Sequence, residues 1–390
     1  MTPIKFTLSA KAFASALAQV TPVVANNAVI PALENVKLTV SGSEAGKRAT
    51  MRLMCSNLET ELQVTLDVDC HTDFAAAVPA KKLLALLKTL PDAPLTCVWN
   101  GESYAFDLSI GRSKYKLAGE NASDFPLTRA SGPTTLTISM SCHTLRAALS
   151  ATMSLCSTDE LRQAMTGVYV EATASELRFV ATDGHRVGYW QADAGDDSVA
   201  AYPLPNSYLI PRSAAALLLA QLDPKSDQVL TLIADATNVR TADGRWVTRL
   251  IDERFPEYRN VIPELRHHNI AIVDRDELLT TMRRLENVAN EKTRQVQLFF
   301  KSDGLVASAQ DIDFSREGQE VVACEFDGEE VEIGFNASYI TQTLALLPAG
   351  LIRIAMSTPN RAAMFTPANN LASDSTLFYL VMPTQIIQHV

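Results

Sequence analysis

The sequence lacks the features that mark secreted, membrane-spanning and metal-binding proteins. Its six cysteines include no Cys-x-x-Cys pair, and its six histidines show no ligand spacing. We therefore expect reduced, mostly buried thiols, with no disulfide framework, metal or cofactor. The most apolar run, residues 214–220, is too short to span a bilayer, and residues 1–6 lack the apolar core of a signal peptide. These absences predict a cytoplasmic protein without a membrane partner.

Motifs of nucleotide-binding and hydrolytic enzymes are missing as well. The chain contains no P-loop, no Gly-x-Gly-x-x-Gly, no Gly-x-Ser-x-Gly and no His-Glu-x-x-His. Asp183 and His185 form a pair in which a carboxylate could orient an imidazole as a general base. Because a glycine separates them, their side chains need not meet, and no nucleophile is indicated by spacing. An enzyme that uses Asp183 and His185 stays as an alternative interpretation.

The length and net charge of the chain further limit the classes of protein to which it can belong. A chain of 390 residues exceeds the usual size of one hydrophobic core, so two or three domains are expected. The net charge of -10 argues against a general nucleic-acid binder, whose surface would be basic.

The apolar pattern at the start of the chain returns further on. Residues 4–8 alternate as a short strand, and Phe13 and Leu17 then begin one face of a helix. Residues 136–140 repeat the strand and Leu145 repeats the helix; 136 − 4 and 145 − 13 both give 132. A constant offset of this kind indicates an internal repeat.

A second landmark supports the same repeat. Val78-Pro79 and Ile210-Pro211 each open a leucine-rich helix, with Pro expected just inside the helix start. The offset 210 − 78 is again 132. A third copy follows, because Phe335 stands 257 positions after Val78 and Pro383 stands 257 positions after Pro126.

The chain is therefore predicted to contain three tandem copies of one α+β domain. Each copy has two amphipathic helices backed by antiparallel sheets. We place the copies at residues 1–132, 133–267 and 268–390, with polar or turn-rich boundaries near 130–133 and 265–268.

Basic residues gather on the predicted helices although the chain is acidic. The helices at 10–21, 79–90, 142–153 and 211–222 carry Lys and Arg but no Asp or Glu. One interpretation is a positive inner surface; the other is that these side chains only solvate exposed helix faces. The basic residues concerned are Lys11, Lys81, Lys82, Lys88, Arg146 and Arg212, joined in the third copy by Arg283 and Arg284 among acidic neighbours.

Residues 180–187 are the most informative short stretch. Residues 176–179 are typical of a strand that runs into Asp183-Gly184, a pair suited to a tight hairpin turn because Gly accepts a positive φ. His185 and Arg186 follow the turn, and the chain then becomes apolar again. The stretch is either a shelf on which a partner docks or an ordinary hairpin with polar turn residues.

Five stretches, spread over all three copies, carry a resemblance to a known family. They are residues 180–187, 251–259, 290–292, 332–336 and 379–383, and Thr-Asp-Gly-His-Arg with Phe-Pro-x-Tyr-Arg is the specific combination. In this order they resemble the bacterial DNA polymerase III beta subunits, the sliding clamps. The resemblance implies a head-to-tail homodimer whose six domains form a ring, with helices lining a hole for duplex DNA and sheets outside.

The same resemblance implies function and partners. A sliding clamp performs no catalysis; it encircles duplex DNA without reading its sequence and tethers a DNA polymerase, which makes synthesis processive. The implied partners are a second copy of the chain, the DNA polymerase III alpha subunit, the clamp loader, and other DNA polymerases and repair proteins that carry a clamp-binding peptide. A divergent second clamp with a specialised polymerase partner is an alternative within the family.

The resemblance also implies a partner pocket between the second and third copies. Apolar side chains would hold leucine and aromatic anchors of a short peptide, while Arg, His and Asn would fix its backbone and polar ends. Carried over by motif, the pocket comprises Arg162, Met165, Thr182, Gly184, His185, Arg186, Val187, Pro256, Val261, Asn336, Tyr339, Leu380, Met382 and Pro383. For Val261, Leu380 and Met382, core packing at a domain junction is the other interpretation.

The dimer interface is expected where an edge of the first copy, around residues 114–117, meets the third copy near residues 285–288. A strand edge with apolar residues would otherwise invite aggregation. The residues expected there are Tyr115, Leu117, Leu285 and Val288.

The chain departs from the family pattern in several places. Asn260 stands where a second Arg is frequent, Ala164 where an aromatic residue is frequent, and Asn27 where a basic DNA contact is common. Residues 384–390 extend past the usual end. These departures leave open the exact peptide preference, the affinity for DNA and the polymerase that is served.

Overall fold

The chain forms two compact units. The computed structural model describes residues 3–26, 28–42, 48–126, 132–173, 175–193, 199–201, 206–226, 228–262, 269–368 and 375–386. Unit 1 comprises Met1–Ser139, Ala216–Asp223 and Gln228–Leu250; unit 2 comprises Met140–Ala215, Pro224–Asp227 and Ile251–Val390. The predicted second copy therefore contributes to both units.

Each predicted copy contains the expected pair of helices. The α-helices of the described residues are α1 Ala10–Val20, α2 Ala80–Thr89, α3 Cys142–Thr152, α4 Arg212–Gln221, α5 Arg275–Glu286 and α6 Ala337–Leu346. Short 3-10 helices are η1 Thr21–Val23, η2 Pro31–Glu34, η3 Ala122–Asp124, η4 Met153–Leu155, η5 Glu160–Met165 and η6 Tyr258–Val261. Each α-helix directly follows a strand, as the repeat predicts.

The strands that precede the helices are β1 Ile4–Ser9, β5 Phe74–Pro79, β9 Leu136–Ser141, β14 Asn206–Pro211, β18 Asn269–Asp274 and β23 Val331–Asn336. The other strands of the first and second copies are β2 Asn35–Ser41, β3 Thr50–Ser56, β4 Thr60–Asp67, β6 Pro94–Asn100, β7 Ala105–Ile110, β8 Ser113–Ala118, β10 Gly167–Ala172, β11 Glu176–Thr182, β12 Arg186–Asp193, β13 Val199–Ala201, β15 Val229–Ala234, β16 Asn238–Thr241 and β17 Trp246–Arg249. Those of the third copy are β19 Gln295–Lys301, β20 Gly304–Asp311, β21 Arg316–Val322, β22 Cys324–Asp327, β24 Leu351–Met356, β25 Ala363–Pro367 and β26 Ser375–Val381.

The strand-to-helix junctions are closed by capping side chains. The side chains of Ser9, Ser141, Asp274 and Asn336 accept backbone N–H groups of the first helical turn, which satisfies donors that the helix itself leaves unpaired. The sequence places Pro79 and Pro211 just inside helix starts, and this is wrong by one position. Each ends a strand, and the helix begins at the next residue.

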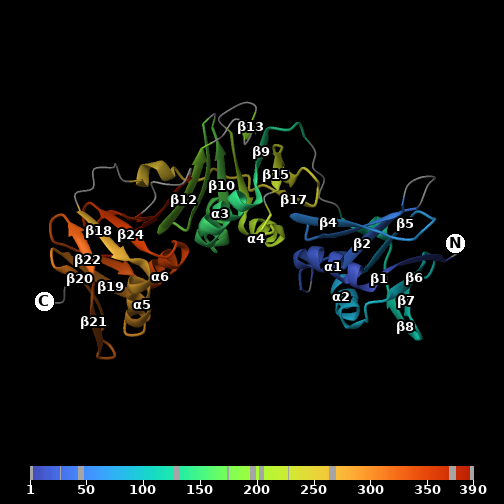
Figure 1. Cartoon of the computed structure of the whole chain (residues 1–390), viewed down its shortest axis with the longest axis horizontal. Coiled ribbons are helices and arrows are strands. Elements are labelled where there is room, and N and C mark those ends of the chain that lie inside the picture. The colour runs from blue at the N-terminus through green and yellow to red at the C-terminus, as the bar shows by residue number, and fades with distance from the viewer. Residues whose placement is uncertain are drawn as a thin grey trace. The chain divides into compact units, whose positions relative to one another are not determined.

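Unit 1 contains two antiparallel sheets and the helix pair α1 and α2. One sheet has the order β1-β6-β7-β8; in the other, β15-β16-β17 of the second copy continues into β4-β3-β2-β5 of the first. At the junction, Val247 of β17 lies opposite Glu61 of β4. Helix α1 packs against β3, β4 and α2 (Figure 1), and it buries Phe13 and Leu17 completely.

Unit 2 repeats this design. One sheet has the order β21-β20-β19-β23, and a nine-stranded sheet has the order β14-β10-β11-β12-β26-β25-β24-β18-β22. Strand β12 of the second copy pairs with β26 of the third, from Arg186 opposite Val381 to Ala192 opposite Ser375. Helices α5 and α6 pack together, α5 also contacts β20 and β21, and α3 lies on β11 and β12 (Figure 1).

Two further expectations, mostly buried cysteines and a hairpin around Asp183-Gly184, are met within the described residues. The six cysteines are free thiols; five are buried and Cys324 is half-buried. The hairpin predicted around Asp183-Gly184 joins β11 to β12. None of the described helices has both the length and the apolar character needed to cross a membrane. The predicted boundary at residues 267 and 268 lies outside the described residues.

A buried carboxylate fastens the segment after β17 to β10. Glu171 is 8% exposed and accepts a hydrogen bond from Arg178 at 2.9 Å, from Arg259 at 2.6 Å and from the hydroxyl of Tyr258 at 2.9 Å. Burial alone would raise the pKa of Glu171, but these hydrogen bonds outweigh it and hold the pKa below its ordinary value. The Phe-Pro-x-Tyr-Arg motif thus has a structural role as an anchor.

Replacing Glu171 with Gln should lower the free energy of unfolding by about 2 kcal/mol at neutral pH, the worth of hydrogen bonds to a charged group. Because the folded pKa of Glu171 is depressed, its contribution is present above the unfolded-state value, near 4.5, and is lost as the pH falls through the lower folded value. Urea unfolding at neutral and acidic pH measures both effects.

The matched control is Glu257→Gln, which removes an ion pair with Arg254 that is largely exposed. Exposed pairs contribute little, so this variant should unfold as the wild type does. Equal stability of Glu171→Gln and Glu257→Gln at neutral pH would contradict the anchoring role.

Candidate partner-binding site

The turn between β11 and β12 is held by the carboxylate of Asp183. Its Oδ1 accepts the backbone N–H groups of His185 and Arg186, at 2.9 and 2.8 Å, and its Oδ2 accepts Nε and Nη2 of Arg186, at 3.0 and 2.8 Å. The Thr182 hydroxyl accepts the N–H of Gly184 at 3.1 Å and donates to the Arg186 carbonyl at 2.7 Å. Gly184 has a φ of 89°, which closes the turn as the Asp-Gly pair predicts.

Arg186 is the centre of a buried polar cluster that joins this turn to α6. The residue is 7% exposed. Its Nη1 donates to Oε1 of Gln342 at 2.8 Å, and its guanidinium lies 4.6 Å from the centre of the Tyr339 ring. Nε2 of Gln342 donates in turn to Oγ of Ser338 at 3.1 Å. Such partners are required because desolvating an unpaired charge is costly.

His185 connects the turn to the end of β26. Its ring stacks on Tyr339 with centres 5.5 Å apart, and its carbonyl accepts the N–H of Met382 at 2.9 Å. Among the described residues, no hydrogen bond joins the His185 ring to the Asp183 carboxylate, whose oxygens bind Arg186 and the turn. The pair is therefore not arranged as a base with its orienting carboxylate.

Strand register builds an apolar floor beside the turn. Val187 lies opposite Thr182 on β11 and opposite Leu380 on β26; Leu380 lies opposite Met364 on β25, and Met364 opposite Ala355 on β24. Residues directly opposite each other on antiparallel strands share a face. All of these residues except Thr182 belong to one buried apolar cluster, named here the floor cluster: Val180, Val187, Tyr189, Leu209, Phe255, Tyr258, Ala355, Ala362, Met364, Phe378 and Leu380.

The segment that follows β17 covers one side of the floor cluster. Phe255 and Tyr258 are buried in it, and Ile262 packs against it. Pro256 follows Phe255 in the chain and Val261 precedes Ile262, so both lie at the edge of the cluster. Pro256 is half-buried, and Val261 is 43% exposed, so part of the apolar surface here faces solvent.

Arg162 and Met165 lie against the turn on another side. A Cβ at Gly184 would stand 3.3 Å from Nη1 of Arg162 and 3.8 Å from Sδ of Met165. The guanidinium of Arg162 is 3.5 Å from a carboxylate oxygen of Asp159, and over half of its side chain is exposed. The glycine therefore gives these two side chains room as well as closing the turn.

The predicted pocket residues all belong to unit 2, on η5, the β11–β12 turn, the η6 segment, the start of α6 and the end of β26. Two of them act differently from the prediction. The guanidinium of Arg186 hydrogen-bonds to Asp183 and Gln342. Asn336 caps α6 by accepting the N–H of Ser338 at 3.0 Å. Leu380 is 2% exposed, which favours its core interpretation, whereas Met382 is 39% exposed. A ligand would meet Met382 and Val261 before it met Leu380.

Sequence reasoning missed three residues of this site. Ala362 and Met364 lie in the floor cluster, and their spacing of two around β25 was a usable strand signal. Gln342 holds Arg186, but no sequence signal could have found it, since a glutamine on a helix is mostly exposed to solvent.

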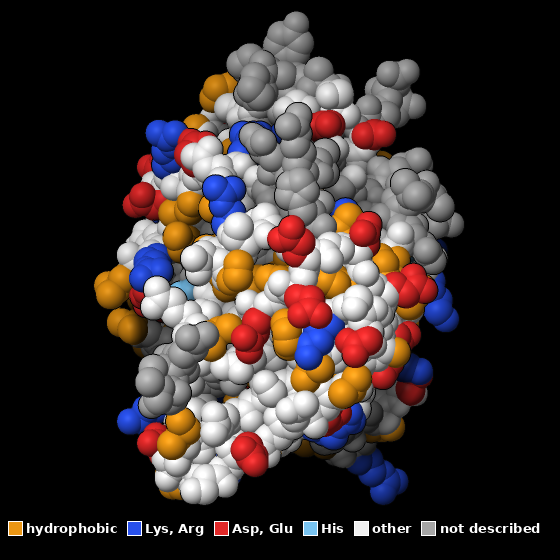
Figure 2. Space-filling model, turned by 90° about the vertical axis from the view of Figure 1, so that its left-hand side faces the viewer, with side chains coloured by type: hydrophobic (Ala, Val, Ile, Leu, Met, Phe, Trp, Pro, Cys, Tyr) orange, Lys and Arg blue, Asp and Glu red, His pale blue; other side chains and the backbone are white. Residues whose placement is uncertain are grey.

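The basic residues predicted to face DNA differ in their surroundings. Lys11, Lys81, Lys82, Lys88 and Arg283 are exposed, and Arg146 and Arg212 are half-buried. Nζ of Lys81 donates to the Ala25 carbonyl at 3.0 Å, and Arg284 is ion-paired with Glu320 of β21, so Arg284 is already engaged within unit 2. Acidic side chains lie among hydrophobic and uncharged ones over the middle of the face in Figure 2.

The whole chain matches one family in three successive parts. Models of the DNA polymerase III beta subunit match with the N-terminal domain at residues 4–129, the central domain at residues 139–257 and the C-terminal domain at residues 259–385.

Individual relatives agree with these matches. The beta sliding clamp of Vibrio cholerae serotype O1 is 30% identical over 388 residues, covering 98% of this chain and 100% of the relative; that of Pseudomonas aeruginosa is 30% identical over 385 residues, with the same shares. The structure of a DnaN sliding clamp (DNA polymerase III subunit beta) from Pseudomonas aeruginosa bound to griselimycin matches with a TM-score of 0.88 and 27% identity, covering 98% of this chain and 100% of that one.

Met382 is the predicted hot spot of the pocket. Changing Met382 to Ala should weaken binding of a synthetic peptide with leucine and aromatic anchors about thirtyfold, since truncating a side chain that a ligand buries costs ~2 kcal/mol. Titration calorimetry measures the affinity. Leu351→Ala, at an exposed apolar residue of β24 outside the floor cluster, is the control and should bind normally. Unchanged affinity of the Met382 variant would place the pocket elsewhere.

Proposed function

Because the chain belongs to the DNA polymerase III beta subunit family, we propose that two copies close into a ring around duplex DNA and tether a DNA polymerase to it. The observation that carries this function is the match of three clamp domains, in order, over nearly the whole chain. The role needs no catalysis, because a ring retains DNA by topology. This proposed role implies that the protein works in the cytoplasm, where the bacterial chromosome lies.

The floor cluster with its rim is the proposed docking site for partner peptides. Met382 and Val261 offer exposed apolar contacts above a packed floor, and the stacked pair of His185 and Tyr339 provides a rigid wall. Anchoring pockets of this kind suit short peptide motifs. The proposed owners of such peptides are the DNA polymerase III alpha subunit, the clamp loader, and other DNA polymerases and repair proteins. We propose the same site for griselimycin.

Two edge strands support the proposed dimer. β8 ends the four-stranded sheet of unit 1, and β21 ends the four-stranded sheet of unit 2. Edge strands offer unpaired backbone groups to a neighbour. β8 carries Lys114, Lys116 and the exposed Tyr115, whereas β21 carries the acidic residues Glu317 and Glu320. Head-to-tail pairing of β8 with the partner's β21 closes a ring if the rotation closes.

The expected interface residues take different parts in this dimer. Tyr115 is exposed and Leu117 and Val288 are half-buried, so these side chains can contact a second chain. Leu285 is 2% exposed on α5, which packs against β21. Leu285 therefore supports the edge strand from within its own domain.

The exposed lysines of α1 and α2 are the proposed DNA contacts, with Arg146, Arg212, Arg283 and Arg284 contributing to the positive potential. Lys81, Lys82 and Lys88 lie on a helix without acidic residues.

For the three clamp domains we propose boundaries at residues 132/133 and 267/268.

Changing Val288 to Asp should yield monomers, because a buried carboxylate at the interface lacks a partner. Light scattering at micromolar protein gives the mass, and circular dichroism checks that the variant is folded. Val229→Asp, at an exposed residue of β15, should stay dimeric. A wild-type mass of one chain would contradict the ring.

A topological clamp differs from an ordinary DNA binder in how it leaves DNA. Loaded onto nicked circular DNA by a clamp loader and ATP, the protein should persist in high salt, because its retention does not depend on phosphate contacts. Cutting the circle should release it over the free ends. Gel filtration of labelled protein with DNA measures retention.

Reversing Lys81, Lys82 and Lys88 to Glu should slow loading while leaving the dimer intact; Lys301→Glu, on a strand, should load normally. Equal retention on circular and linearised DNA would count against the ring.

A further inference from the structure

The chain that follows the pocket is tied down by hydrogen bonds. After Met382 and Pro383, the N–H of Thr384 donates to the carbonyl of Gly334 at 2.8 Å. The side-chain amide of Gln295 on β19 donates to Oγ1 of Thr384 at 3.1 Å and to the carbonyl of Gln385 at 2.7 Å. Residues 384–386 thus continue from the pocket onto the sheet of β19 and β23.

The tail lies close against β23, and a glycine makes this possible. A Cβ at Gly334 would stand 2.8 Å from the carbonyl oxygen of Thr384, 3.0 Å from Cγ1 of Ile386 and 3.1 Å from Nε2 of Gln295. The first is a backbone atom, so a side chain at Gly334 would force the tail away. Strand β23 therefore has a site shaped for this segment.

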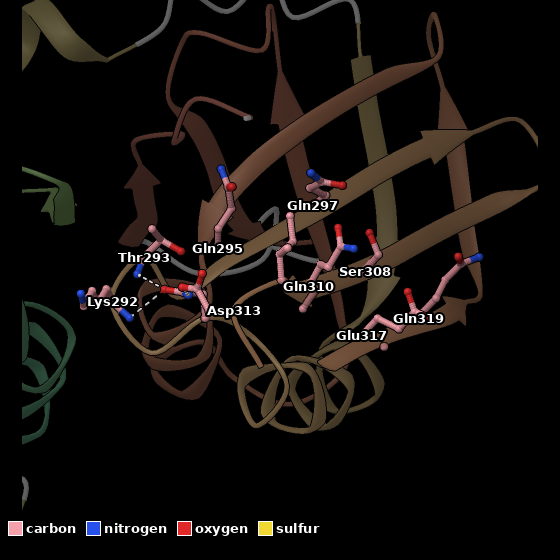
Figure 3. Close-up of a pocket in the computed structure, with 13 residues that line it drawn as sticks. Lys292, Thr293, Gln295, Gln297, Ser308, Gln310, Asp313, Glu317 and Gln319 are labelled. Atoms are coloured by element: carbon pink, nitrogen blue, oxygen red, sulfur yellow. Dashed lines mark hydrogen bonds between the residues drawn. The ribbon is translucent and has the colours of Figure 1, made fainter. Parts of the chain in front are cut away.

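Gln295 belongs to a polar surface on the face of the sheet turned away from α5. Gln297 lies opposite Ser308, which lies opposite Gln319, and Gln310 lies on the same face of β20. Figure 3 shows these side chains on neighbouring strands, where they line a hollow of about 990 Å3. Among the described residues, Gln295 alone of these amides binds the tail, so Gln297 is a matched control on the same strand and face.

We propose that residues 384–386 are a clip that holds Met382 in place for partner binding, and that Gln295 and Gly334 are positioning residues for that binding. This inference rests on the proposed partner site. Met382 is held on one side by its N–H bond to the His185 carbonyl and on the other by the clip two residues later. When residues 384–386 detach from the sheet, only the hydrogen bond from the Met382 N–H to the His185 carbonyl still holds Met382. A peptide must then order the segment around Met382 when it binds, which lowers its affinity.

The clip predicts that residues far from the peptide control its affinity. Gln295→Ala should weaken binding of a fluorescent peptide matching the tail of the DNA polymerase III alpha subunit by roughly three- to tenfold, the worth of one to two hydrogen bonds. Gln295→Glu, which keeps the shape but has no N–H to donate, should lose at least as much. Gly334→Ala should act in the same direction, and Gln297→Ala should bind normally.

A second arm separates positioning from general stability. In a chain that ends at Pro383, binding should already be weakened, and Gln295→Ala should then cause no further loss, since its partner is gone. Hydrogen exchange should show faster exchange of the Thr384 amide in Gln295→Ala, with exchange in β10 and β11 unchanged.

The outcomes are distinguishable. If the wild-type chain does not bind the peptide, the proposed partner site fails and the clip fails with it. If the wild type binds and Gln295→Ala binds equally well, or if Gln295→Ala still weakens the shortened chain, the partner site stands and the clip is refuted.

Discussion

The antiparallel pairing of β12 with β26 is the interaction on which the candidate site depends. It joins the second and third copies into one nine-stranded sheet, and its register sets Val187 opposite Leu380. A shift of the strand register by one residue would turn every side chain on one strand to the other face of the sheet. The side chains of that strand would then leave the floor cluster. The pocket is thus a consequence of joining two domains by hydrogen bonds, so neither domain could form it alone.

Two buried charges each fasten a segment of unit 2 that contributes to the candidate site. Glu171 holds the segment with Tyr258 and Arg259 against β10, and Arg186 holds the turn after β11 against α6 through Gln342. Both groups are almost fully buried and held by several hydrogen bonds, and such buried polar networks can specify one arrangement. Rigid walls reduce the ordering that a peptide must provide on binding.

The bounds of the two compact units differ from those of the three repeats in the sequence. Copies were recognised by repeated residues, but sheets continue from one copy into the next at β4–β17 and at β12–β26. The predicted second copy therefore divides between units 1 and 2. Such continuous sheets bury edges that would otherwise be exposed within a chain, and they leave β8 and β21 as sheet edges for the proposed dimer.

The sequence by itself determined the local structure and the repeat. Alternating and helical apolar spacing located the four helices predicted at 10–21, 79–90, 142–153 and 211–222 to within about one residue at each end. Asp183-Gly184 located the hairpin, because these signals act between near neighbours. Tertiary structure decided the roles of particular side chains. Arg186 and Asn336 are engaged within the fold. The roles of Gln295, Gln342 and Met364 depend on contacts with residues far away in the sequence. Those contacts join residues dozens of positions apart, and no local spacing encodes which of many exposed glutamines a folded chain will bring to a partner.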